Sequence, residues 1–130
     1  MTQPSTVKLT RYIRPRRMVS GFKRDIDSQQ GVTLNIELDY SRRLIDVQYA
    51  ICNHSAGEPS FSKDLGRQYA ATRVPITLPM WEGPSKLVGT DLTEYVVGGL
   101  NSVAPIGISR SDLHRINQMY MKAASRPLNT

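Results

Sequence analysis

The stretch that decides the fold reads VTLNIELDY over residues 32–40, and after a short turn the chain continues with IDVQYAI over residues 45–51. In both segments apolar and polar side chains alternate, so the apolar ones share one face of an extended chain. Only residues 41–44 separate the segments, which favours an antiparallel hairpin over about residues 32–52. The apolar face of this hairpin has to be covered by a helix or by a second sheet.

Three later segments carry apolar side chains at helical spacing. They predict helices over about residues 61–73, 91–100 and 109–126. In the first of them, Phe61, Leu65 and Tyr69 lie four residues apart, and we expect this stripe to face the core. Residues 75–90 contain three prolines, so we expect mostly irregular chain between the first and second helices, with a short strand at Ile76-Thr77-Leu78 as the alternative.

The length and composition fit one domain. A chain of 130 residues is a usual size for a single unit, and we expect residues 32–126 to form its core and residues 1–24 a basic N-terminal arm or edge strand. The hydrophobic share of 39% is slightly low for a globular domain, which favours additional stabilisation by a second subunit. The sequence therefore predicts an α+β fold, with an antiparallel sheet and three helices, that assembles as an oligomer.

Positive charge is concentrated at the N-terminal end. The net charge is +6, and no acidic residue precedes Asp25. Such a basic arm attracts polyanions, nucleotides or acidic protein surfaces. The alternative is a solvated terminus that only keeps the protein soluble. The basic residues of the arm are Lys8, Arg11, Arg14, Arg16, Arg17, Lys23 and Arg24.

The remaining composition favours an intracellular protein. Cys52 is the only cysteine, which excludes an internal disulfide framework and favours a reduced, cytoplasmic setting. No apolar run approaches the roughly 20 residues of a membrane span, so we expect no membrane contact. The basic N-terminus is not followed by an apolar segment and is therefore not typical of a secretory signal.

The sequence does not predict a catalytic centre, a metal site or a cofactor. Cys52 and His54 lie two residues apart, but nucleophilic thiol chemistry also needs a positioned base and usually a third, orienting group. We interpret them as a half-buried cysteine and a loop histidine. One cysteine and two histidines are too few for a zinc site without carboxylates.

The sequence contains more groups suited to binding anions than groups suited to catalysis or metal binding. Phosphate recognition needs positive charge, forked donors and often the amides at a helix N-terminus. Two of the predicted helices offer such donors: Lys63 with Arg67, and Arg110 with His114 and Arg115. Each set is also consistent with an ordinary solvated helix face.

Two aromatic rings and one glycine complete the candidate set. Trp81 and Phe61 are able to stack on a base, although Phe61 also fits the core. Gly66 permits the close approach of another helix or of a phosphate, or it is a tolerated helix glycine that costs about 1 kcal/mol. The predicted ligand-binding residues are therefore Phe61, Lys63, Gly66, Arg67, Trp81, Arg110, His114 and Arg115.

The run FSKDLGR over residues 61–67, with the preceding YAICN at residues 49–53, resembles the first-described family of phage anti-Thoeris sponge proteins. The resemblance covers about residues 32–73 and the rest of the chain only in outline. It implies an α+β protein that is not an enzyme and that binds cyclic ADP-ribose isomers, or in some members cyclic oligonucleotides, without cleaving them. It also implies dimers or hexamers with pockets at subunit contacts, acting in the host cell cytoplasm if the protein is phage-encoded.

Two other functions fit the sequence. The basic residues 8–24 favour an accessory protein that binds nucleic acid through weak, sequence-independent contacts. The small size also fits a protein inhibitor of a host enzyme.

Overall fold

The computed structural model describes residues 6–20, 23–26, 30–53, 63–83, 86–103 and 107–124. It confirms the α+β class, with one four-stranded antiparallel sheet, a separate two-stranded sheet and three helices in the described residues. In chain order the elements are β1 (Thr6–Ile13), β2 (Arg16–Ser20), β3 (Lys23–Ile26), β4 (Gln30–Asp39), β5 (Leu44–Asn53), α1 (Lys63–Ala71), β6 (Ile76–Pro79), α2 (Gly89–Val103) and α3 (Arg110–Ala124).

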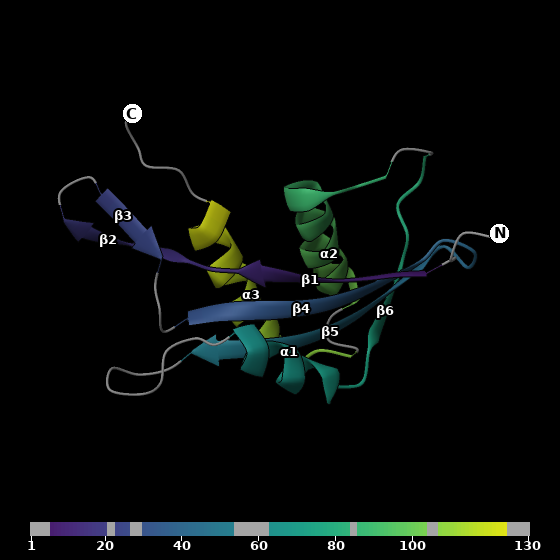
Figure 1. The fold of residues 1–130 in the computed structure, drawn as a ribbon, viewed down its shortest axis with the longest axis horizontal. Helices are drawn as coiled ribbons and strands as arrows, with labels where there is room; N and C mark the ends of the chain where they lie inside the picture. The colour runs from purple at the N-terminus through teal and green to yellow at the C-terminus, as the bar shows by residue number, and fades with distance from the viewer. Residues whose placement is uncertain are drawn as a thin grey trace.

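The predicted hairpin is the centre of the main sheet. It forms β4 and β5, which pair from Gln30 opposite Asn53 to Asp39 opposite Leu44. The strand order is β1-β4-β5-β6, so the N-terminal segment adds an edge strand to β4, as expected (Figure 1). At the hairpin turn the Asp39 carboxylate accepts hydrogen bonds from the Ser41 hydroxyl and the Arg42 N–H, and these two bonds lower the pKa of Asp39.

Within residues 75–90 the alternative short strand forms as β6, and the described residues between Pro79 and Gly89 belong to no strand or helix. Ile76 and Leu78 point into the core and are 6% and 1% exposed, while Thr77 between them lies on the opposite face. Pairing of this segment with β5 outweighs the effect of the neighbouring prolines, because Pro79 occupies the last position of an edge strand.

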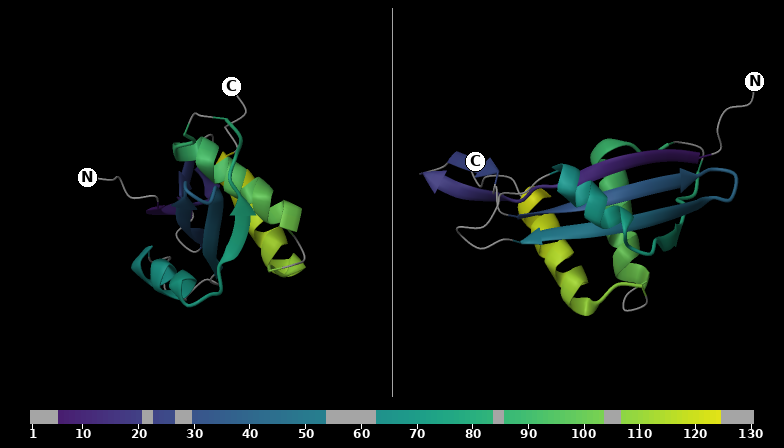
Figure 2. Two further views of the ribbon diagram at one scale, coloured as in Figure 1. Left: turned by 90° about the vertical axis from the view of Figure 1, so that its right-hand side faces the viewer. Right: turned by 60° about the horizontal axis from the view of Figure 1, so that its bottom comes forward.

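The two faces of the main sheet are covered differently. Figure 2 shows α2 and α3 packed against one face and α1 lying on the other. The face under α2 and α3 carries the alternating apolar residues, and Val32, Leu34, Ile36 and Leu38 are each at most 2% exposed. These strand residues pack with buried side chains of α2 and α3 into one hydrophobic core.

The predicted buried face of α1 is wrong. Leu65 and Tyr69 are 48% and 61% exposed, and Phe61 lies outside the described residues. The helix instead contacts the sheet through its small residues Gly66 and Ala70. Small side chains allow a nine-residue helix to lie close to the strands, so its large apolar side chains face outward.

The two C-terminal helices follow the prediction closely. Leu92, Val96 and Leu100 of α2 are buried, and the Ser109 hydroxyl accepts the Asp112 N–H at 3.1 Å to cap α3. In the parts of the chain that the structure describes, none of the helices combines the length and the apolar character needed to cross a membrane.

Candidate functional site

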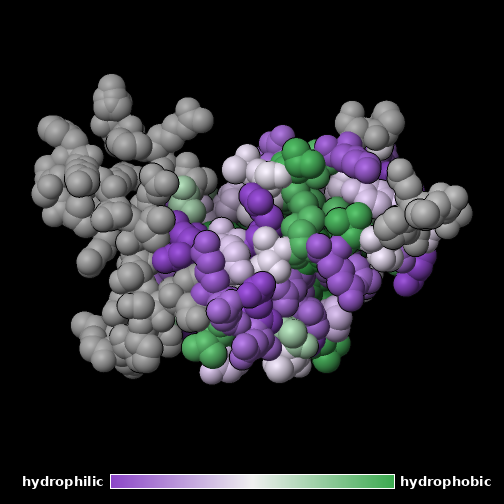
Figure 3. Space-filling model, viewed as in Figure 1, coloured by the Kyte–Doolittle hydropathy of each residue, from purple (hydrophilic) through white to green (hydrophobic). Residues whose placement is uncertain are grey.

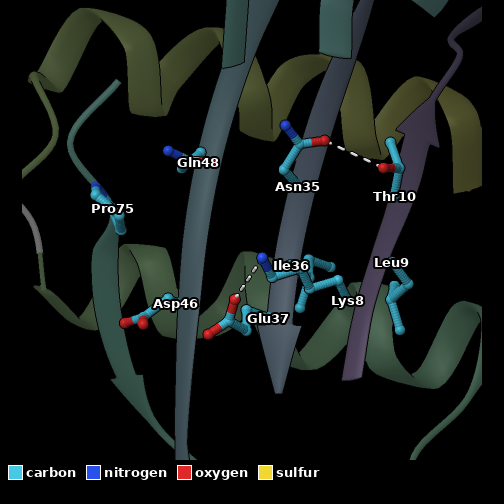
Figure 4. Close-up of a pocket in the computed structure, with 9 residues that line it drawn as sticks. All are labelled: Lys8, Leu9, Thr10, Asn35, Ile36, Glu37, Asp46, Gln48 and Pro75. Atoms are coloured by element: carbon cyan, nitrogen blue, oxygen red, sulfur yellow. Dashed lines mark hydrogen bonds and ion pairs between the residues drawn. The ribbon is translucent and has the colours of Figure 1, made fainter. Parts of the chain in front are cut away.

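An open groove lies on the polar face of the main sheet, beside α1. This helix lies against Thr33 and is hydrogen-bonded by Asn35 and Gln48, and the part of the face beyond these contacts forms a hollow with a volume of about 550 Å³ (Figure 4). Figure 3 shows that hydrophilic side chains gather on this side of the molecule, next to a hydrophobic band. The polar residues that line the groove are Lys8, Thr10, Asn35, Glu37, Asp46 and Gln48.

The strand register arranges these side chains in two rows across the sheet. Because side chains alternate between faces, every second residue of neighbouring strands stands on the same side. One row consists of Thr10, Asn35 and Gln48. The other row consists of Lys8, Glu37, Asp46 and Thr77.

The amide row fixes the C-terminal half of α1 to the sheet. Asn35 Nδ2 donates to the carbonyl oxygen of Arg67 at 3.2 Å. Gln48 Nε2 donates to the carbonyl oxygens of Ala71 and Arg73 at 3.3 and 2.8 Å. Carbonyls at the end of a helix have no donor within the helix, so the Gln48 amide supplies donors there, while Asn35 adds a further donor to the Arg67 carbonyl inside α1.

The charged row contains two carboxylates and one cation. Lys8 Nζ lies 3.5 Å from a carboxylate oxygen of Glu37, and the Thr77 hydroxyl donates to Asp46 Oδ1 at 2.6 Å. Glu37 and Asp46 stand directly opposite each other on β4 and β5. Like charges in this arrangement destabilise a sheet, and the exposed lysine offsets this only weakly.

A second hollow, of about 600 Å³, shares Asn35 with the groove and runs along α1. Arg67 and Asp64 line it and form an ion pair with each other. The guanidinium of Arg67 is therefore close to the groove and is held by an exposed contact that contributes little free energy.

Two predicted residues of α1 have clear structural surroundings. Lys63 Nζ lies 4.9 Å from the ring centroid of Tyr12 on β1. Gly66 lies against Thr33 of β4, where an added Cβ would come within 2.2 Å of the threonine hydroxyl oxygen. Close approach is thus the role of Gly66 seen here, and its neighbour is a strand instead of a helix.

The predicted cations of α3 lie on the opposite face of the main sheet from those of α1. Arg110, His114 and Arg115 are exposed on α3, whereas Lys63 and Arg67 belong to α1 on the opposite face (Figure 2). One chain therefore does not bring the two predicted cation sets together.

Trp81 is part of the core. It is 8% exposed, and its ring meets the Tyr95 ring edge-on with centroids 5.8 Å apart. Its carbonyl oxygen also accepts a hydrogen bond from Arg43. A ring buried in this way does not offer a face to a ligand, and Phe61, the other predicted ring, lies outside the described residues.

Arg73 connects the groove side to the core side of the sheet. Its carbonyl oxygen accepts a hydrogen bond from Gln48 Nε2, and its guanidinium lies 4.8 Å from the ring centroid of Tyr49. The Tyr49 hydroxyl donates to Asp112 of α3 at 2.6 Å. Burial, together with this hydrogen bond to a carboxylate, raises the pKa of Tyr49 to about 12.

The groove residues were not among the predicted site residues. From the sequence, their alternation with apolar residues indicates only a solvated strand face. The detectable signal is the concentration of amides and carboxylates at Asn35, Glu37, Asp46 and Gln48, which the hairpin places opposite one another.

Comparison with known proteins gives no relative: no family model, no curated protein and no solved structure matches the chain.

Proposed function

We propose that the protein is a non-catalytic binding protein that sequesters small cyclic nucleotide signals, either cyclic ADP-ribose isomers or cyclic oligonucleotides. The observation that carries this proposal is the groove of about 550 Å³, which lies within the size range of small-molecule pockets. Its amide side chains are already fixed by hydrogen bonds to α1, so little ordering is needed when a ligand binds. In this proposal the ligand is held and released with its bonds intact.

The cations near the groove are suited to the phosphates of such a ligand. Lys8 lines the groove, Arg67 lines the adjoining hollow, and Lys63 lies at the β1 side of α1. Because the Arg67–Asp64 pair is exposed, the guanidinium is able to exchange its carboxylate partner for a phosphate at little cost.

Self-association as a dimer or hexamer is part of the proposal. Among the described residues β1 pairs with β4 only, and an unpaired strand edge is a template for a second chain. Arg110, His114 and Arg115 enter the ligand site only through a neighbouring subunit, since within one chain they lie across the sheet. Sedimentation velocity at micromolar concentration tests this part, and a monomer at all concentrations would contradict it.

Isothermal titration with cyclic ADP-ribose isomers and cyclic dinucleotides tests the main proposal. We expect micromolar or tighter binding, and mass spectrometry of the ligand released by heat should recover it unchanged. The absence of binding to every compound would refute the proposal, and recovery of a cleaved product would refute its non-catalytic part.

Binding of nucleic acid is the second candidate, and the β2–β3 pair supports it. These strands form a separate two-stranded sheet that projects beyond the end of the main sheet, and their sequence contains Arg16, Arg17, Lys23 and Arg24 (Figure 1). Fluorescence anisotropy with labelled duplex DNA tests this candidate. Its signature is an affinity that falls steeply with salt and is lost when the four basic residues are replaced by serine.

A further inference from the structure

The two carboxylates in the groove are placed at a cost to stability. Glu37 and Asp46 are directly opposed residues of the two central strands. Opposed side chains on one face of an antiparallel sheet have Cβ atoms roughly 4.5–5.5 Å apart. At this separation the two negative charges repel each other, and the only cation in the groove lining, Lys8, contacts Glu37 alone among the described residues.

The hydrogen-bond donors of the groove are largely in use. The Asn35 amide donates to α1 and its oxygen accepts from Thr10 at 3.1 Å. The Gln48 amide donates to two carbonyls at the end of α1. The donors that remain for a ligand belong mainly to Lys8, which stands at the β1 side of the groove.

The acceptors of the groove remain available. Asp46 Oδ1 receives the Thr77 hydroxyl, whereas Asp46 Oδ2 accepts no hydrogen bond within the described residues. The same holds for Gln48 Oε1 and for the Glu37 oxygen that does not face Lys8. The floor of the groove is therefore rich in acceptors, and it suits a ligand group that donates hydrogen bonds.

We propose that Glu37 and Asp46 recognise sugar hydroxyls of the ligand, with Gln48 Oε1 as a third acceptor. The inference rests on the proposed function, because the sugar is then the ribose of a bound nucleotide. A carboxylate that accepts a ribose hydroxyl is a recurring device in nucleotide-binding folds. The negative charge of the pair repels phosphates from the space beside Asp46 and favours their placement near Lys8, at the β1 side, and near Arg67. The pair thus makes the groove selective for ribonucleotides over deoxyribonucleotides.

Matched ligands test the selectivity directly. Cyclic di-AMP and cyclic ADP-ribose are each titrated beside the analogue that lacks the 2′-hydroxyl. We expect the wild-type protein to bind the ribose form at least about tenfold more tightly, since hydrogen bonds to a charged group contribute roughly 1.5–3 kcal/mol. In Asp46→Asn and in Glu37→Gln the preference should shrink several-fold, while the affinity for the deoxy form changes little. Glu82→Gln, an exposed carboxylate away from the groove lining, is the control and should keep the full preference.

Equal affinity of the wild-type protein for the two forms overturns the inference. A loss of affinity in Asp46→Asn that is equal for both forms overturns it as well. If no nucleotide binds, the proposed function fails, and saturation-transfer NMR with D-ribose and 2-deoxy-D-ribose then decides the inference by itself. Transfer to D-ribose alone that disappears in the Glu37→Gln/Asp46→Asn double variant supports hydroxyl recognition, and no transfer to D-ribose refutes it.

Discussion

Gly66 of α1 and Thr33 of β4 are in such close contact that a Cβ on the glycine would lie 2.2 Å from the threonine Oγ1 and 3.2 Å from its Cβ. Thr33 is fully buried, so it has no room to move away. This contact sets the distance between α1 and the sheet, and with it the shape of the second hollow, which Asn35 and residues of α1 line.

The first prediction concerns Gly66→Ala. Alanine is the better helix former by about 1 kcal/mol, yet we expect a loss of about 1–3 kcal/mol in the free energy of unfolding because the new methyl group overlaps Thr33. Urea denaturation measures the change. Gly98→Ala is the matched control, since nothing lies within 4 Å of its added Cβ in α2, and it should stabilise the protein. Thr33→Ala should recover part of the loss when combined with Gly66→Ala, and an unchanged or raised stability of Gly66→Ala alone would contradict the contact.

The second prediction concerns high pH. The pKa of Tyr49 is raised to about 12, above its ordinary value near 10. Between these values the unfolded chain loses the phenolic proton while the folded protein retains it, so the stability that Tyr49 contributes is complete below pH 10 and is lost as the pH rises toward 12. Compared with pH 8, we expect a decrease of roughly 1 kcal/mol at pH 11 from this group. Urea denaturation of the wild type and Tyr49→Phe at both pH values checks it, and parallel decreases in the two proteins would contradict it.

The third prediction concerns the opposed carboxylates in the absence of ligand. Asp46→Asn removes one of two like charges and keeps an oxygen for Thr77, so we expect the free protein to gain roughly 0.2–1 kcal/mol in low salt. The gain should shrink in 1 M salt, where charges are screened within about 3 Å. A clear destabilisation at low salt would mean that the repulsion between Glu37 and Asp46 is negligible.

The fourth prediction concerns Arg67 as a phosphate contact. Arg67→Ala should weaken the binding of a cyclic nucleotide by at least about tenfold, since a charge-assisted contact of this kind contributes about 1.5–3 kcal/mol. Its exposed pair with Asp64 should contribute little to folding, so the free energy of unfolding should change by less than about 1 kcal/mol. Arg42→Ala, in the exposed hairpin turn, is the control and should bind normally. Equal affinities of the two variants would exclude Arg67 from the site.

The central hairpin was predictable because apolar and polar residues alternate along both of its strands. Alternation over residues 32–40 and 45–51 leaves one arrangement that buries the apolar side chains, and the short turn fixes the pairing. The two C-terminal helices were predictable for the same reason, since their apolar stripes are long. Local pattern and tertiary packing agree in these elements.

The packing of α1 was not predictable from its own sequence. The four-residue spacing of Leu65 and Tyr69 is correct for a helix, but it does not indicate which face the sheet accepts. Thr33, more than thirty residues earlier, selects the face that contains Gly66. The groove was missed for a related reason, because the opposition of Glu37 to Asp46 follows from the register and not from either residue alone.

The pairing of β1 with β4, from Thr6 opposite Asp39 to Ile13 opposite Val32, has a practical consequence. The basic N-terminal segment is not a detachable tail, because its residues Thr6–Ile13 form β1, a strand of the sheet that supports the groove. Trimming it would uncover the flank of β4 and remove Lys8 together with its strand. Truncation would therefore remove both the charges and the strand. To test the charges alone, experiments have to substitute single basic side chains and keep β1 in place.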